Sequence, residues 1–316
     1  MSERGLVLLG YRVRTRVILR YWGYLSLSLA VMAAVPMCVG FAFSDHTFAL
    51  WALGAFAGLL AFGLICSRIS APREMQVNEG LVVVALTFLL GAAVMSLPLA
   101  AAGLPLIDAF FESGSGLTTT GLSTLGSIEK QSAAFVFARA WLQWYGGLAI
   151  VVLALALVLG PSNVTRRLAG DTDHEEIVSG TQARARQLLS LYAGLTVVAI
   201  LGIWLLGAPF FQAVVHGLSA ISTGGFSSYD DSIVGFGGWP LRIGITAVCL
   251  FGAVSFSLQY RALRAGWRAI AADRELHTLL IACLVTATAL SASMALAGRW
   301  SLGEIILNAP IMAVSA

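Results

Sequence analysis

Two short runs of hydroxyl and glycine residues stand in otherwise apolar sequence. The first reads SGSGLTTTGLST at 113–124, and the second reads GLSAISTGGFSS at 217–228. Backbone carbonyl oxygens of such uncharged turns can replace the hydration shell of a monovalent cation, strongly enough to dehydrate the ion and weakly enough to release it. Glycine permits the positive φ angles that this arrangement of carbonyls requires. The residue types therefore indicate a cation-coordinating turn within TTTGL and another within STGGF.

An alternative interpretation is that these small residues only allow helices to pack closely, as in small-xxx-small interfaces. Taken alone, TTTG favours this packing interpretation. The run recurs, however, because Pro105 falls on Pro209 and Gly121 on Gly225 when the sequence is shifted by 104 residues. Recurrence at an equivalent point of a second repeat favours a re-entrant pore loop.

Each repeat predicts a helix, a short half-helix, the polar turn and a second helix. The half-helices are expected near 105–117 and 209–221, with a third starting near 301. The prolines suit a first helical turn, and Ser301 with Glu304 has capping-box spacing. Non-helical backbone at membrane depth must be buried in protein or line a watery cavity, so the polar turns are expected at a pore.

The composition excludes a water-soluble domain. The chain has 316 residues, of which 58% are hydrophobic and 11% charged, with a mean hydropathy of +0.86; soluble domains carry about 25% charged residues. The membrane must therefore be the solvent. Segments long enough to span are expected at 22–43, 48–66, 80–100, 133–159, 187–208, 241–260 and 276–297, and the first two form a leading hairpin.

The placement of basic residues predicts the orientation. With a cytoplasmic N-terminus and short segments that dip in and return, all but four of the 19 Lys and Arg residues fall on the cytoplasmic side. A signal peptide is the competing interpretation of the basic N-terminus. The apolar stretch is too long for one, and no small-residue cleavage site follows it.

Catalytic and metal chemistry is not expected. The four cysteines fall in predicted spans without paired spacing, and the four histidines are scattered, so they predict neither disulfides nor a transition-metal site. An intramembrane enzyme would need a nucleophile–base pair or metal ligands, but the chain has no HExxH and no GxSxG motif. We therefore expect no enzyme, no covalently bound cofactor and no nucleic-acid partner.

Four segments together resemble a known family. They read FFESGSGLTTTG, WLQWYGGLAIVVLALAL, HGLSAISTGGFS and VNEGLVVVAL, and they are similar to the Trk/Ktr/HKT potassium transporter superfamily, in particular its TrkH branch. The resemblance implies an all-α polytopic membrane protein with four helix–pore loop–helix units around one path, preceded by a two-helix hairpin. It also implies an ion filter of backbone carbonyls from Thr118, Thr119, Thr120, Gly121, Ser222, Thr223, Gly224 and Gly225.

The same resemblance implies the function and its setting. Potassium uptake is expected across a bacterial inner membrane, with K⁺ as the transported ion, a nucleotide-binding regulatory partner of the TrkA type and a homodimer in the bilayer. In this superfamily a serine at the first filter glycine goes with sodium permeation, and this chain has Gly121 there. A sodium-permeable or K⁺/Na⁺-coupled transporter of the same fold stays an alternative. A secondary carrier of another type is less favoured. Such carriers often have inverted repeats, whereas the copies in this chain are expected to run in the same orientation.

The repeats divide the chain into four parts. Residues 1–74 hold the cytoplasmic N-terminus and the leading hairpin, 75–170 the first unit, 171–270 the second, and 271–316 an incomplete third unit. The third filter strand and the fourth unit of the family pattern have no counterpart here. The chain is thus either a fragment of a longer protein or a natural truncation, and we expect a fragment.

Charged residues near the loops have two interpretations each. Arg139 either braces the first loop through Glu112 or snorkels to the membrane interface, and the sequence leaves both open. Glu112 is expected to have a structural role rather than to concentrate cations at the mouth. His216 occupies the equivalent position of the second repeat, which argues against a ring of carboxylates. Asp230, beyond the second loop, is expected in a solvated loop.

Overall fold

A computed structural model describes residues 13–72, 75–159, 174–255, 258–259, 273–298 and 300–315. Residues 1–12 of the predicted cytoplasmic N-terminus and residues 160–173, which follow the predicted span 133–159, lie outside these residues. The described part of the chain is helical throughout, with connecting loops. Its elements are α1 (Thr15–Ala42), α2 (His46–Ser67), α3 (Val77–Ala101), α4 (Leu106–Leu117), α5 (Ala133–Leu159), α7 (His174–Leu205), α8 (Phe210–Ile221), η1 (Ser232–Gly235), α9 (Trp239–Ala253), α12 (Arg274–Ala297) and α13 (Leu302–Ser315).

The helices repeat in the order that the sequence predicts. The half-helices α4 and α8 each span 12 residues and follow an N-cap proline, Pro105 or Pro209, with almost the same backbone angles. The prolines thus precede the first helical turn instead of lying in it. Units α3–α4–α5 and α7–α8–α9 have the same architecture, and α12–α13 begins a third.

Five described helices are long and apolar enough to cross a membrane: α1, α2, α3, α7 from Arg186 on, and α12. The prediction of one continuous span at 241–260 is wrong, because α9 ends at Ala253 and Val254 is extended. Gln259 explains the break, since its Nε2 donates to the carbonyl oxygens of Phe251 (2.8 Å) and Val254 (3.0 Å). These bonds satisfy carbonyls that a helix end leaves unpaired.

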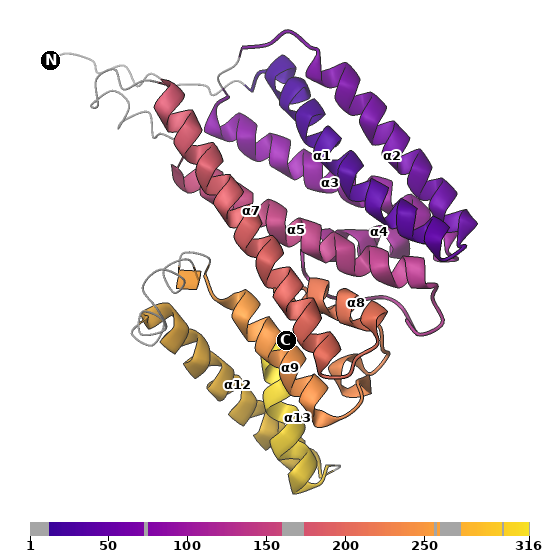
Figure 1. Ribbon diagram of the computed structural model, residues 1–316, viewed down its shortest axis with the longest axis vertical. Coiled ribbons are helices and arrows are strands. Elements are labelled where there is room, and N and C mark those ends of the chain that lie inside the picture. The colour runs from indigo at the N-terminus through magenta and orange to yellow at the C-terminus, as the bar shows by residue number, and fades with distance from the viewer. Residues whose placement is uncertain are drawn as a thin grey trace, which may run out of the picture.

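The leading hairpin and α3 form one end of the molecule (Figure 1). There α1 packs against both α2 and α3, whereas α12 and α13 lie at the opposite end, with α5 and α7 between. The close contact of α1 and α2 depends on Gly23, where a Cβ would lie 2.5 Å from the backbone nitrogen of Ser67. The N-termini of α1 and α3 are joined by Arg14, whose Nε and Nη2 donate to the buried carboxylate of Glu79 at 2.8 and 2.9 Å.

Candidate ion-coordinating loops

The two polar turns have the same backbone. We call residues 118–121 the first polar loop and residues 222–225 the second. Thr119 and Thr223 have φ angles of 56° and 52°, and Gly121 and Gly225 have φ angles of 78° and 80°. A left-handed threonine is uncommon, and strained backbone of this kind is frequent at functional sites. The predicted equivalence of the two loops therefore extends to their conformation.

Hydrogen bonds at the end of each half-helix repeat as well. The amide of Thr120 donates to the Ser115 carbonyl at 2.9 Å, and the amide of Gly224 donates to the Ser219 carbonyl at the same distance. Each loop therefore begins at the C-terminal end of its half-helix, which carries partial negative charge. A cation bound at either loop would lie close to that negative end.

The two loops touch each other at Gly121. A Cβ at this position would overlap the carbonyl oxygen of Gly224, and the positive φ of Gly121 independently disfavours any other residue. The following helices also approach the half-helices through glycine. A Cβ at Gly146 on α5 would overlap the carbonyl oxygen of Leu117, and one at Gly252 on α9 would lie 2.7 Å from that of Ile221.

Glu112 connects the first half-helix to the segment that follows the first polar loop. Its Oε1 accepts bonds from Ser123 Oγ (2.6 Å) and the amide of Thr124 (2.8 Å), and its Oε2 pairs with Arg139 Nε at 2.8 Å. Arg139 is 3% exposed, and its guanidinium lies 3.8 Å from the ring centroid of Phe226. Because the side chain is buried and paired, Arg139 does not reach the membrane interface as a snorkelling arginine would.

His216 makes the corresponding connection in the second unit. Its Nε2 lies 3.0 Å from Ser228 Oγ and accepts from the amide of Ser228 at 3.4 Å. Ser228 corresponds to Thr124 in the repeat. In both units, therefore, the half-helix is joined to residues two or three positions past the loop glycine. The chemistry differs, since an anion makes this connection in the first unit and an imidazole in the second.

Asp230 joins the two segments that follow the polar loops. Its Oδ2 accepts from Ser127 Oγ at 2.7 Å, and its Oδ1 accepts from the amide of Ile128 at 2.6 Å. The hydrogen bond from Ser127, followed by those from backbone amides, holds the pKa of Asp230 below its usual range. Asp230 thus lies in an exposed loop, as expected, and it also makes a contact between the units that the sequence did not predict.

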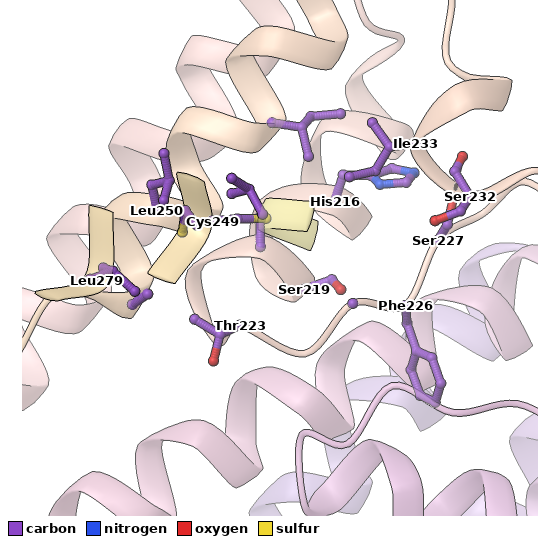
Figure 2. Close-up of a pocket in the computed structure, with 16 residues that line it drawn as sticks. His216, Ser219, Thr223, Phe226, Ser227, Ser232, Ile233, Cys249, Leu250 and Leu279 are labelled. Carbon is purple, nitrogen blue, oxygen red and sulfur yellow. Dashed lines mark hydrogen bonds between the residues drawn. The ribbon is translucent and has the colours of Figure 1, made fainter. Parts of the chain in front are cut away.

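A cavity of about 130 Å³ lies beside the second polar loop. Figure 2 shows Ser219 and Thr223 at this cavity with Cys249 of α9 and Leu279 of α12, while the ring of Phe226 points away from it. Val314 of α13 also lines the cavity, so the second loop faces the start of the third unit. Among the described residues, no group of three or more His, Cys, Asp or Glu side chains is placed to hold a metal ion.

Sequence reasoning missed Gln143. This residue lies on α5 and is fully buried, and its side-chain amide bonds with Ser219, Gly224 and Phe226 of the second unit. The available signal was a single amide side chain in WLQWYGGLAIVV, a stretch that is otherwise apolar or aromatic. Such a group must find a partner when it is buried at membrane depth.

Known proteins match the chain over most of its length. A family model described as TrkH, cation transport protein, matches residues 47–276. The Trk system potassium uptake protein TrkH of Halomonas elongata is 33% identical over 259 residues, which are 79% of this chain and 54% of that protein. The TrkH of Escherichia coli K12 is 33% identical over 208 residues, covering 62% and 43% of the two chains.

A solved structure matches the fold. The crystal structure of the potassium transporter TrkH from Vibrio parahaemolyticus has a TM-score of 0.80 with 27% identity, over 96% of this chain and 64% of that one. The chain spans about half the length of the curated relatives that it matches. The relatives are named as potassium uptake proteins of a Trk system.

Proposed function

The chain belongs to the TrkH family of cation transport proteins, and we propose that it contributes two carbonyl-lined loops to a path for potassium uptake. One observation carries the proposal: residues 118–121 and 222–225 share the same unusual backbone, each at the C-terminal end of a half-helix. Carbonyl dipoles fixed by such a backbone can replace the water around K⁺. We expect no catalytic chemistry and no resident cofactor.

The half-helices supply the electrostatics. The C-terminal end of a helix carries about half a negative elementary charge, so α4 and α8 would both favour a cation at the loops that follow them. The eight loop residues carry no fixed charge. A K⁺ ion would therefore be held by dipoles alone, which allows release into the cell down its electrochemical gradient.

Gly121 supports selectivity for K⁺ over Na⁺. A side chain there would meet the Gly224 carbonyl, which would move the two loops apart or twist them. The spacing and field of the carbonyls would change as a result. A sodium-permeable or coupled transporter of the same fold is the alternative, and the ion preference of the wild-type protein decides between them. A carrier with inverted repeats is disfavoured, because we expect the two units to run in the same orientation through the membrane.

The buried polar residues behind the loops would act as braces. Each half-helix is connected to the segment after its polar loop, by Glu112 with Arg139 in the first unit and by His216 in the second. We propose that these connections hold each loop in the conformation that admits a single ion when other parts of the protein move. In this proposal residues 75–170 and 171–270 are the first two units of a four-unit path, and 271–316 begin the third.

The names of the relatives support partners for the proposed path. They are components of a Trk system, so we propose a cytoplasmic nucleotide-binding regulatory subunit of the TrkA type and a second copy of the transporter. We propose that the N-terminus lies in the cytoplasm of a bacterial cell, with the helices in the inner membrane, and the positions of the basic residues support this orientation.

Growth at low K⁺ tests the proposal. A bacterium that lacks its potassium uptake systems would express the protein as its gene encodes it, as wild type or as Gly121→Ser, with membrane amounts measured by immunoblot. We expect the wild type to restore growth and Gly121→Ser to lose rescue or to shift uptake toward Na⁺. A wild type that reaches the membrane without restoring growth, or a Gly121→Ser variant with unchanged ion preference, would contradict the proposal.

A further inference from the structure

Gln143 belongs to the first unit by sequence but to the second unit by its contacts. It lies on α5, and its side chain is fully buried. Its Oε1 accepts hydrogen bonds from Ser219 Oγ at 2.7 Å and from the amide of Phe226 at 3.2 Å. Its Nε2 donates to the carbonyl oxygen of Gly224. One amide thus forms hydrogen bonds with the end of α8, with the second polar loop and with the segment after that loop.

The amide also fills the place of a side chain in the second polar loop. A Cβ at Gly224 would overlap the Cδ, Oε1 and Nε2 atoms of Gln143. The equivalent residue of the first loop is Thr120, which has a side chain of its own, and its Oγ1 bonds with Thr118 Oγ1 at 2.8 Å. The first loop is therefore braced by its own hydroxyls, and the second by a residue from the neighbouring unit.

The bond from Gln143 reaches the point where the loops meet. The carbonyl of Gly224 lies against Gly121 of the first loop, and it accepts the hydrogen bond from Gln143 Nε2. This hydrogen bond occupies one lone pair of the Gly224 oxygen and fixes the direction in which the carbonyl points. The number and field strength of carbonyl dipoles determine how a filter distinguishes K⁺ from Na⁺. A change at Gln143 should therefore alter ion preference as well as stability.

We propose that Gln143 is a positioning residue that sets the cation selectivity of the second polar loop. It acts through Gly224 and has no contact with the ion itself. The selectivity role rests on the proposed function, whereas the contact between Gln143 and Gly224 can be tested without transport. Two measurements separate these claims.

The first measurement is a double-mutant cycle of Gln143→Ala and Gly224→Ala, read as thermal stability of the purified protein in detergent. Each single change should lower the melting temperature, because one leaves unpaired polar groups in a cavity and the other overlaps the amide. The φ angle of Gly224 lies outside the left-handed region, so alanine is allowed there once the amide is gone. We expect the double variant to be more stable than the sum of the two losses predicts. Additive losses would contradict the contact.

The second measurement is the ratio of K⁺ to Na⁺ uptake by cells that express the protein as its gene encodes it. Gln143→Met keeps about the same volume but removes the donor to the Gly224 carbonyl, and it introduces no group that could donate in its place. We expect the ratio to fall about tenfold, the effect of losing one buried hydrogen bond in a selective state. Ser26→Ala is the control, because Ser26 is equally buried but bonds within its own helix to the Trp22 carbonyl.

The outcomes are distinguishable. A K⁺-selective wild type whose ratio is unchanged in Gln143→Met, at equal membrane amounts, would overturn the selectivity role of Gln143 and leave the proposed function intact. A wild type that carries neither cation would overturn the proposed function and the selectivity role together. Coupling in the thermal cycle would still identify Gln143 as the residue that holds the second loop. A lower ratio in Gln143→Met but not in Ser26→Ala supports the inference.

Discussion

Arg139 Nε lies 2.8 Å from Glu112 Oε2, and both side chains are almost fully buried. This pair connects α5 to the half-helix that precedes the first polar loop, and the same guanidinium stacks on Phe226 beyond the second loop. A charge at membrane depth is costly unless it is paired, so Arg139 is expected to stay beside Glu112. Its contact with Phe226 then joins both units at this place. Both oxygens of Glu112 have partners in the structure, so we expect a structural role for this carboxylate rather than a place in a ring at a pore mouth.

Removing one partner of the pair should destabilise the protein strongly. Arg139→Met leaves Glu112 as an uncompensated buried charge, so we expect a loss of about 3–5 kcal/mol. Arg139→Met combined with Glu112→Gln should recover a large part of this loss, because no buried charge is then left unpaired. Thermal unfolding of the purified protein measures both. A double variant as unstable as Arg139→Met alone would show that the charge pair is not the source of the effect.

His216 should tolerate replacement only by another acceptor. His216→Leu removes the acceptor of the Ser228 amide and should cost about 1–3 kcal/mol. His216→Gln can still accept this bond and should cost less. Hydrogen exchange at the Ser228 amide reports the contact directly. Equal exchange rates in the wild type and in His216→Leu would contradict the assignment.

Glycine on α5 should be required for space rather than for flexibility. Alanine normally stabilises a helix relative to glycine by about 0.5–1 kcal/mol, but a Cβ at Gly146 would overlap the Leu117 carbonyl. We expect Gly146→Ala to lower stability by about 1–3 kcal/mol. Gly202→Ala on α7 is the control, because a Cβ there meets no atom within 4 Å. The two substitutions should therefore shift the melting temperature in opposite directions.

The contact of Asp230 with Ser127 and Ile128 should depend on the ionised form of Asp230. Its pKa is lowered in the folded protein, so the contribution of this contact to stability is present at neutral pH and is lost as the pH falls through that lowered pKa. Asp230→Asn should speed hydrogen exchange at the Ile128 amide at neutral pH, and Asp231→Asn should not. The difference between Asp230→Asn and the wild type should vanish in acid. A difference that persists below the pKa would exclude the carboxylate as its cause.

The sequence was most informative where signals are local. Hydropathy and the recurrence of Pro105 and Pro209 predicted the half-helices to within a residue or two, and the repeat predicted that Gly121 and Gly225 are equivalent. These features follow from neighbouring residues and from the limited ways in which a chain can satisfy its backbone in a membrane.

The missed features join residues far apart in the chain. The bonds of Gln143 with Gly224 and of Asp230 with Ser127 depend on how two units pack, which periodicity does not encode. The break after Ala253 was missed for a similar reason. The apolar run continues past it, and the amide of Gln259 that satisfies the end of α9 reads as one polar residue in a span. The choice between bracing and snorkelling at Arg139 likewise needed the position of Glu112.

The most direct test of the central claim is to locate a heavy K⁺ substitute by anomalous scattering. Crystals of the protein as its gene encodes it, grown in Rb⁺, should have an anomalous peak bounded by the carbonyls of the first and second polar loops, and Na⁺ in excess should not remove it. Gly121→Ser should weaken the peak or lose it. A wild-type crystal with ordered loops and no Rb⁺ between them would contradict the assignment of residues 118–121 and 222–225 to the ion path.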